Sequence, residues 1–249
     1  MTVGAIIQAR LSSTRLPKKV LKPLNDDLNI LDLLIKRIST CNFIDKIIIA
    51  TSTNEVDKEL IEFSKQKKIS FFAGSENDVL SRFYECATKF NLHTIIRVTA
   101  DDPFKDPLVI EDVYNAYLNG GCDYASNTLK PSYPEGIDIE IFNYTSLSMA
   151  NRDATLLSER EHVTPYIWKN SDTFKLKNIK ANRDYSKIRL TVDYEEDFYL
   201  AQKILNHFYP DTLFGYELIV EYLNSIKINY NIERNEGYKK SLKEDLNGS

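Results

Sequence analysis

Cysteine is scarce in this chain of 249 residues. Its three cysteines, Cys41, Cys86 and Cys122, are odd in number and widely spaced, which predicts neither a disulfide framework nor a Cys-x-x-Cys metal site. The three histidines stand nowhere near a cysteine at the spacing of zinc ligands. We therefore expect free buried thiols, and we expect any bound metal to be one that prefers oxygen ligands.

Glycine is also rare, with eight in the whole chain. The first apolar run, residues 3–8, is not followed by the G-x-G-x-x-G of dinucleotide-binding proteins. The G-x-x-x-x-G-K-[ST] spacing of a Walker A loop is absent as well. These absences argue against a dinucleotide oxidoreductase and against a Walker A phosphate site.

Long apolar runs and an excess of basic residues are missing too. No run approaches the roughly 18 residues of a membrane span, and the start lacks the basic and apolar regions of a signal peptide. The formal net charge is -4 and the pI is near 5.5, which argues against a general nucleic-acid binder. We expect a cytoplasmic protein whose partners include neither a membrane nor a nucleic acid.

The first half of the chain alternates short apolar runs with amphipathic stretches. This pattern is typical of βα units around a mostly parallel sheet, so we expect an α/β fold. Strands are predicted at residues 3–8, 46–51, 69–72 and 94–98. Helices are predicted at 31–39, 56–66, 78–90 and 108–118, with Asn54 and Asn77 as N-caps of two of them.

From residue 123 onward the pattern changes, and we interpret 123–180 as a strand-containing insertion that serves a substrate or a second subunit. Strands are predicted at 124–127, 137–141, 174–179 and 189–192. Helices are predicted at 159–169, with a break or kink at Pro165, and at 196–208 and 216–226. Residues 229–249 are expected to be a polar tail with a frayed end, and residues 1–249 to form a single domain.

A basic, hydroxyl-rich loop follows the first predicted strand. It contains Arg10, Arg15 and Lys19 together with Ser12 and Ser13, a local excess of positive charge in an acidic protein. A strand that ends in such a turn brings backbone N–H donors and flexible cations to one point, where a triphosphate can bind. The alternative is a solvated surface loop without a ligand.

Two carboxylates follow predicted strands at distant points of the chain. Asp101 comes after the fourth predicted strand, and Asp193 comes after the last one. Since open α/β sheets bind ligands at the carboxyl ends of their strands, the two carboxylates can converge on one Mg²⁺. A triphosphate would supply further ligands, so two carboxylates are sufficient. The alternative for Asp101, which stands two residues before a proline, is a turn or a helix cap.

Further polar side chains occur in the insertion and after it. Asp138 and Glu140 are two residues apart on a predicted strand and share a face, which either is buried with polar partners or is a solvent-facing edge. Arg160 and His162 either contact an anionic substrate or form surface pairs, and His162 is also a candidate base. Another group follows the third predicted strand, where it is placed to line a nucleotide pocket: Ser75, Asp78 and Arg82.

Six motifs in order resemble the cytidylyltransferase family that activates acidic sugars, and within it the branch named for a spore-coat polysaccharide biosynthesis protein. The opening I-I-Q-A-R-x-x-S-T-R-L-P-x-K-V-L is present at residues 6–21. The others are G-S-x-x-D-V-L-x-R at 74–82, D-Y-x-S-N at 123–127, G-x-D-x-E at 136–140, R-E-H-V-T-P-Y-I at 160–167 and L-T-V-D-x-x-E-D at 190–197. Together they span about four fifths of the chain, which makes the resemblance specific.

The resemblance implies a Rossmann-like nucleotide-diphospho-sugar transferase fold. It also implies a reaction in which an acceptor oxygen attacks the α-phosphate of CTP and releases pyrophosphate. Asp101 and Asp193 match the carboxylates that hold Mg²⁺ in the related synthetases for Kdo and sialic acids. The residues expected to carry catalysis are Arg10, Arg15, Lys19 and Asp101. The expected nucleotide contacts are Gln8, Ala9, Arg10, Ser12, Ser13, Arg15, Lys19, Ser75, Arg82 and Thr99. The expected acceptor contacts are Asn127, Asp138, Glu140, Arg160 and His162.

Two positions of the basic loop depart from the family. Ser12 and Lys18 stand where relatives often have glycine. A turn that needs a positive φ would be strained at these positions, or it would adopt another shape.

Three hypotheses about function follow. The leading one is a Mg²⁺-dependent cytidylyltransferase that makes a CMP-activated acidic sugar, a nonulosonic or Kdo-like acid, for a surface glycan. The second is a nucleotidyltransferase with a phosphorylated acceptor, whose extra phosphate Lys18 and Arg160 would serve. The third is a non-catalytic nucleotide-binding protein on the same fold. Related synthetases are commonly dimers, so we also expect a homodimer.

Overall fold

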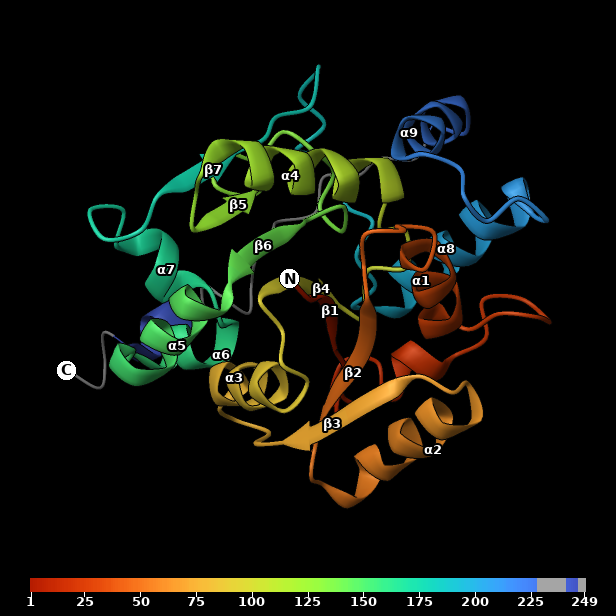
Figure 1. Ribbon diagram of the computed structural model, residues 1–249. Helices are drawn as coiled ribbons and strands as arrows, with labels where there is room; N and C mark the ends of the chain where they lie inside the picture. The colour runs from red at the N-terminus through yellow and green to blue at the C-terminus, as the bar shows by residue number, and fades with distance from the viewer. Residues whose placement is uncertain (228–240, 246–249) are drawn as a thin grey trace.

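One seven-stranded sheet organises the chain. The structure is a computed structural model and describes residues 1–227 and 241–245. The sheet order is β3-β2-β1-β4-β6-β5-β7, which runs from the bottom to the top of Figure 1. The strands are β1 (Val3–Gln8), β2 (Lys46–Ser52), β3 (Ser70–Gly74), β4 (Thr94–Thr99), β5 (Tyr124–Ser126), β6 (Glu140–Asn143) and β7 (Leu176–Asn178). In the part of the chain described, every pair is parallel except those of β6 with β4 and β5.

Helices cover both faces of this sheet. They are α1 (Ile30–Ile38), α2 (Lys58–Gln66), α3 (Val79–Lys89), α4 (Pro107–Gly120), α5 (Tyr144–Asp153), α6 (Leu157–His162), α7 (Pro165–Lys169), α8 (Glu195–Phe208) and α9 (Tyr216–Ser225). In Figure 1, α3, α5, α6 and α7 lie on one side, and α1, α8 and α9 on the other. Successive strand residues alternate between the two layers, because their side chains point to opposite faces. On β4, Ile96 and Val98 pack in one core, and Ile95 packs in the other.

The order of the strands creates a binding crevice. The chain moves from β1 to β2 and β3 on one side, and then returns to place β4 on the other side of β1. The connections at the carboxyl ends of β1 and β4 therefore diverge. In open α/β sheets this switch point is where ligands bind. It places the basic loop after β1 next to the acidic turn after β4.

Two expectations about the strands of the second half are wrong. The strand predicted at 137–141 begins only at Glu140, and α5 follows this strand directly although no helix was expected there. Residues 189–192 form no strand of the sheet. They are extended, but their backbone bonds go to loops: Leu190 N–H donates to the Glu135 carbonyl, and Val192 N–H donates to the Asp101 carbonyl at 2.9 Å. The alternation of buried apolar residues correctly indicated an extended segment. It does not indicate which groups accept the hydrogen bonds of the backbone.

The expected caps are also partly wrong. Asp78 caps α3, accepting a hydrogen bond from Ser81 N–H at 2.9 Å, in place of Asn77. Asn54 precedes a short 3₁₀ helix, Glu55–Asp57, and its side chain makes no capping bond. Short polar residues adjacent in sequence compete for the same capping role, so their order is not fixed by residue type.

The break expected at Pro165 is confirmed. Helix α6 ends at His162, and α7 begins at Pro165, whose missing N–H costs nothing at the first position of a helix. The polar tail predicted at 229–249 lies mostly outside the described residues. Its described part, 241–245, is helical, and Ser241 is buried.

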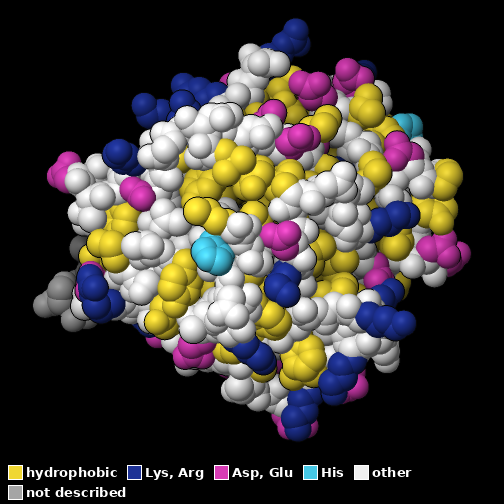
Figure 2. All heavy atoms as spheres, viewed as in Figure 1, with side chains coloured by type: hydrophobic (Ala, Val, Ile, Leu, Met, Phe, Trp, Pro, Cys, Tyr) yellow, Lys and Arg dark blue, Asp and Glu magenta, His cyan; other side chains and the backbone are white. Residues whose placement is uncertain are grey.

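The face of the molecule shown in Figure 2 carries charged side chains of both signs. Basic and acidic side chains are interspersed on this face, with apolar side chains between them (Figure 2). Across the described residues, no helix combines the length and the apolar character that crossing a bilayer requires.

Lys18 adopts the left-handed conformation, with φ 55° and ψ 21°, so the strain expected at this glycine-like position is present. Lys18→Gly should stabilise the fold by about 0.5 kcal/mol. Relief of about 1 kcal/mol of strain outweighs the loss of an exposed ion pair with Glu59 and the greater freedom of glycine in the unfolded chain. Lys65→Gly is the matched control, because it also loses an exposed ion pair but lies in the right-handed last turn of α2, and should cost roughly 0.5–1 kcal/mol. Urea unfolding that ranks both variants as equally destabilised would contradict this account.

Candidate active site

Two cavities meet at the carboxyl ends of β1 and β4. The first, which we call the loop cavity, has a volume of about 620 Å³ and is lined by the basic loop. The second, the insertion cavity, has about 430 Å³ and lies toward residues of the insertion. Thr99, Asp101 and His162 line both. The two cavities therefore share a wall, as two ligands that exchange a group would require.

The basic loop is anchored by carboxylates from the segments that follow β2 and β3. Leu11 N–H donates to Asp57 Oδ1 at 2.7 Å, and Asp57 is fully buried. Ser12 Oγ donates to Glu76 Oε1 at 2.9 Å. This bond and one from Asn54 hold the pKa of Glu76 below its ordinary value. The Ser12 hydroxyl thus fixes the loop in addition to lining the cavity.

Lys19 joins the loop to both predicted metal carboxylates. Its ammonium lies 2.9 Å from Asp101 Oδ2, 2.8 Å from Asp193 Oδ1 and 2.7 Å from the Val192 carbonyl. Burial alone would lower the pKa of Lys19, but the two carboxylates outweigh it and raise that pKa. Carboxylates 92 positions apart in the sequence therefore converge on one buried point, as the sequence predicted.

Close backbone packing brings Asp193 to this point. Gly136 has φ 98°, and a Cβ built on it would lie 2.9 Å from Thr191 N, so only glycine lets the two segments approach. The side chains of Arg15 and Arg189 then hold the Asp193 carboxylate, each at 2.6 Å. Burial alone would raise the pKa of Asp193, but Lys19 and Arg15 reverse the direction and lower it.

Arg10 differs from the other cations of the loop. Its side chain is exposed on the loop cavity, and among the described residues no hydrogen bond or ion pair engages it. Arg15 and Lys19 are already paired with carboxylates. Arg10 is therefore placed to meet an incoming anion without breaking an existing bond.

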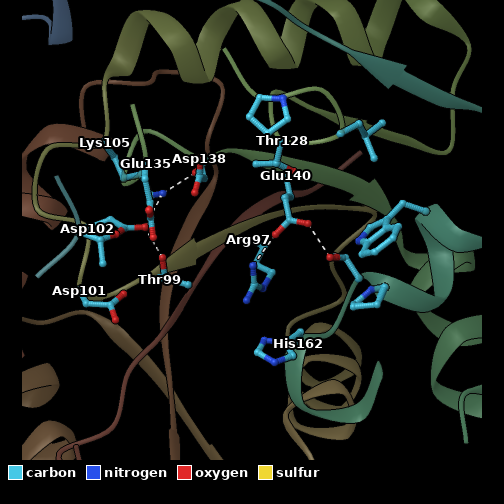
Figure 3. Close-up of a pocket in the computed structure, with 16 residues that line it drawn as sticks. Arg97, Thr99, Asp101, Asp102, Lys105, Thr128, Glu135, Asp138, Glu140 and His162 are labelled. Atoms are coloured by element: carbon cyan, nitrogen blue, oxygen red, sulfur yellow. Dashed lines mark hydrogen bonds and ion pairs between the residues drawn. The ribbon is translucent and has the colours of Figure 1, made fainter. Parts of the chain in front are cut away.

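In the insertion cavity, Glu140 is buried and fully engaged (Figure 3). It pairs with Arg97 and accepts hydrogen bonds from Tyr124 Oη at 2.6 Å and Thr164 Oγ1 at 2.5 Å. Burial alone would raise the pKa of Glu140, but Arg97 leads the effects that lower it. Arg97 was missed in the sequence, although its position two residues before Thr99 on the same strand face was a usable signal. Its Nε is buried and has no hydrogen-bond partner in the described chain.

A buried ion pair forms the floor of the same cavity. Lys105 Nζ lies 2.8 Å from Asp102 Oδ2 and also donates to the backbone carbonyl of Asp138. Thr99 and Thr191 hydroxyls donate to the Asp102 carboxylate. Burial alone would raise the pKa of Asp102, whereas Lys105 and the hydroxyls lower it. Asp138 and Glu140 both line the cavity, but Asp138 precedes the strand, so the shared strand face that was expected does not exist.

The turn between α6 and α7 is strained. Val163 has φ 72° and ψ -54°, and Thr164 N–H donates to the His162 carbonyl at 2.9 Å, which together make a γ-turn of the rare type with positive φ. A β-branched residue is seldom found there, and such strain is characteristic of functional sites. The turn directs His162 and Thr164 to the wall of the insertion cavity.

The predicted site residues separate into two groups. Those that line a cavity are Gln8, Ala9, Arg10, Ser12, Ser13, Arg15, Lys19, Thr99, Asp101, Asp138, Glu140, His162 and Asp193. Four others line neither cavity: Ser75, Arg82, Asn127 and Arg160. Arg82 donates to the Ser75 carbonyl, and burial lowers its pKa to about 10. Arg160 pairs with Asp78 and ties α6 to the start of α3.

Asn127 bridges two backbone groups in the interior. Its Nδ2 donates to the Ile137 carbonyl at 2.9 Å, and its Oδ1 accepts from Ile139 N–H at 2.8 Å. We predict that Asn127→Ala lowers the free energy of unfolding by about 2 kcal/mol, because both buried groups lose their partner, and leaves the KM for the acceptor unchanged. Thermal unfolding and steady-state kinetics on the same sample check this. A higher KM with unaltered stability would instead place Asn127 in contact with the acceptor.

The charge of the loop cavity bears on metal binding. In the part of the chain that the structure describes, its lining contains four carboxylates, Glu76, Asp101, Glu161 and Asp193, and three cations, Arg10, Arg15 and Lys19. A triphosphate in this cavity therefore needs additional positive charge. The described residues offer no group of three or more protein ligands of the kind that could hold a metal alone. Two hard carboxylate donors do fit Mg²⁺ when phosphate oxygens and waters complete its shell.

These features define the class of protein. The protein is a nucleotidyltransferase. It has a mostly parallel sheet with a crevice at the switch point, a basic loop after β1, and two carboxylates that converge beside this loop. The model of the cytidylyltransferase family matches residues 4–230, and the chain belongs to this family.

Several known proteins are similar to this chain. It is 35% identical over 211 residues to an uncharacterized protein of Methanocaldococcus jannaschii, covering 84% of this chain and 85% of that protein. It is 36% identical over 200 residues to the spore coat polysaccharide biosynthesis protein SpsF of Bacillus subtilis, covering 78% of this chain and 82% of that protein. A cytidylyltransferase structure from Leptospira borgpetersenii has a TM-score of 0.87 and 30% identity, covering 94% of this chain and 99% of that chain. The expected family and fold are confirmed.

Proposed function

We propose that the protein is a Mg²⁺-dependent cytidylyltransferase that transfers CMP from CTP to a sugar acid for surface glycan biosynthesis. The observation that carries the proposal is the wall shared by the two cavities, formed by Thr99, Asp101 and His162. The loop cavity would hold CTP, and the insertion cavity would hold the acceptor. The α-phosphate and the attacking oxygen then meet beside Asp101.

The basic loop supplies the grip on the triphosphate. Arg10 binds it without giving up an existing partner, whereas Arg15 and Lys19 exchange part of their carboxylate contacts for phosphate oxygens. Charge-assisted hydrogen bonds of this kind are the strong ones, and Arg can bind phosphate in a bidentate way. Buried anchoring of the loop through Asp57 fixes the geometry before the nucleotide arrives.

Asp101 and Asp193 are the residues that would hold Mg²⁺, which when bound neutralises charge on the phosphates. The ammonium of Lys19 now lies between their carboxylates. A cation is therefore already favoured at this point by both side chains. The preference of the site for positive charge supports the assignment of both carboxylates as ligands.

The reaction needs no covalent enzyme intermediate. A hydroxyl oxygen of the acceptor forms a bond to the α-phosphorus, and the bond from this phosphorus to the oxygen that bridges to the β-phosphate breaks. Pyrophosphate leaves with the electron pair, and the proton of the hydroxyl passes to a base or to water. Positioning and neutralisation of the charge on the leaving group are what the chain contributes, through Arg10, Arg15 and Lys19.

The charge of the insertion cavity favours a sugar acid over a phosphorylated acceptor. Among the described residues, its lining has five carboxylates against two cations, Arg97 and Lys105, and both cations are already paired. A single carboxylate with hydroxyl groups is easier to accommodate here than a dianionic phosphate. Lys18 and Arg160, the cations considered for an extra phosphate, pair elsewhere with Glu59 and Asp78.

A screen of nucleotides against acceptors tests the proposal. Purified protein with Mg²⁺ and CTP should release pyrophosphate with at least one nonulosonic or Kdo-like acid and not with sugar 1-phosphates. ATP, GTP and UTP serve as controls for the donor. Release with a phosphorylated acceptor alone would favour the second hypothesis, and CTP binding without any turnover across the panel would favour a non-catalytic protein.

A further inference from the structure

A segment far along the chain packs against the wall between the two cavities. Residues 241–245 lie on α6, where Asp245 Oδ1 accepts a hydrogen bond from Ser158 N–H at 3.0 Å. Ser241 is 2% exposed, although it belongs to a region of polar sequence. Its hydroxyl contacts both Glu161 and His162. The segment 241–245 therefore reaches two of the α6 residues that line the cavities.

The hydrogen bonds of Ser241 determine the protonation of the imidazole. Its hydroxyl donates its one proton to Glu161 Oε2, and a carboxylate can only accept. Ser241 Oγ, which lies 3.1 Å from His162 Nε2, must then act as the acceptor in the second bond. His162 is thereby held with the proton on Nε2, and Nδ1 is the acceptor nitrogen of the neutral ring.

His162 occupies a position where this tautomer matters. It lines both cavities, and Figure 3 shows it beside Arg97 at the wall of the insertion cavity. The strained turn at Val163 fixes the backbone immediately after it. The ring that lines both cavities is therefore held with a fixed arrangement of hydrogen-bond donor and acceptor.

The charges around His162 favour the neutral ring. Glu161 on its own helix, Arg97 on β4, Glu140 on β6 and Asp245 on the segment 241–245 all act on it. Burial is the largest effect and lowers the pKa of His162, Arg97 acts in the same direction, and the three carboxylates oppose them. The net pKa lies below its ordinary value.

We propose that residues 241–245 complete the active site, with Ser241 as a positioning residue that holds His162, at the wall shared by the two cavities, in the Nε2–H tautomer. The catalytic part of this proposal rests on the proposed function. The hydrogen-bond relay from His162 through Ser241 to Glu161 does not rest on the proposed function, because it is a property of the protein without substrate. The segment 241–245 is thus functional. Removing the Ser241 hydroxyl changes the hydrogen bonding of His162 without changing any other side chain that lines the two cavities.

Kinetics test the catalytic part. Ser241→Ala should reduce kcat about tenfold, with little change in the KM for CTP, because the imidazole loses its fixed orientation. Without the Ser241 bond, the charge of Glu161 acts more strongly on His162, so the acidic limb of the kcat profile should move to higher pH. Ser241→Thr keeps the hydroxyl and should restore most of the rate. Equal losses in the alanine and threonine variants, or no loss in either, would overturn the role of the hydroxyl.

Nitrogen NMR of histidine tests the relay independently of turnover. In the full-length wild-type protein, ¹⁵N-labelled His162 should show a protonated Nε2 and an unprotonated Nδ1, and Ser241→Ala should change the tautomer ratio. His162→Gln assigns the signal among the three histidines. A wild-type protein with the proton on Nδ1 overturns the proposal. A protein that shows the Nε2–H tautomer but no CMP transfer to any acceptor leaves the relay intact and contradicts the proposed function instead.

Discussion

Asp101→Asn should reduce kcat for CMP transfer by about a thousandfold while leaving the fold intact. Asp101 lines both cavities and is one of the two carboxylates that we propose hold Mg²⁺, so on this proposal its charge acts where the phosphate bond breaks. Asparagine has the same shape, and its carbonyl oxygen can still accept the hydrogen bond of Lys19. The loss should therefore appear in catalysis and not in stability, which steady-state kinetics and thermal unfolding separate.

Asp172→Asn is the matched control for this variant. Asp172 is exposed and lines neither cavity, so the same chemical change there should leave kcat within error of the wild-type value. An Asp101→Asn enzyme that retains most of its activity would show that the shared wall is not the site of reaction. A variant that unfolds would call for Asp193→Asn, which tests the other carboxylate.

Lys19→Met should destabilise the metal-free protein by about 3 kcal/mol and make it respond strongly to Mg²⁺. Lys19 is buried and joins Asp101 to Asp193, so its removal leaves two carboxylates without their shared cation. Mg²⁺ held by the two carboxylates would stabilise the folded protein relative to the unfolded chain, and in the variant no ammonium competes for the site. Added Mg²⁺ should therefore recover much of the lost stability.

Urea unfolding in EDTA and in Mg²⁺ measures this response. The midpoint of Lys19→Met should rise with Mg²⁺ by clearly more than that of the wild type. Lys105→Met is an informative comparison, because it also removes a buried cation from an ion pair but leaves Asp101 and Asp193 unchanged. Equal responses of all three proteins to Mg²⁺ would show that the two carboxylates do not bind the ion.

The location of the loop cavity could be predicted from the sequence because the residues that form it directly follow strands. The basic loop comes immediately after β1, and Asp101 comes immediately after β4, so a correct strand assignment fixes their common location. Asp193 was placed correctly for a partly wrong reason. It follows an extended segment, but this segment is held by backbone hydrogen bonds to Glu135 and Asp101 and is not a strand of the sheet.

The insertion cavity was harder to predict because the residues that contact one another there are far apart in the sequence. Arg97 meets Glu140 only because β6 inserts antiparallel beside β4, and Ser241 meets His162 across 79 residues. Asn127 belongs to a family motif, but a motif does not distinguish a side chain that contacts a ligand from one that supports the backbone. The expected homodimer and the cytoplasmic location stay predictions.

The most direct test of the central claim is ³¹P NMR of the product purified from a reaction with CTP, Mg²⁺ and a sugar acid. Attack on the α-phosphate at the wall between the two cavities predicts a product with one phosphorus signal in the phosphodiester range, together with free pyrophosphate. A product with the paired signals of a diphosphate would contradict the claim, since it would mean that the acceptor brought its own phosphate to the insertion cavity.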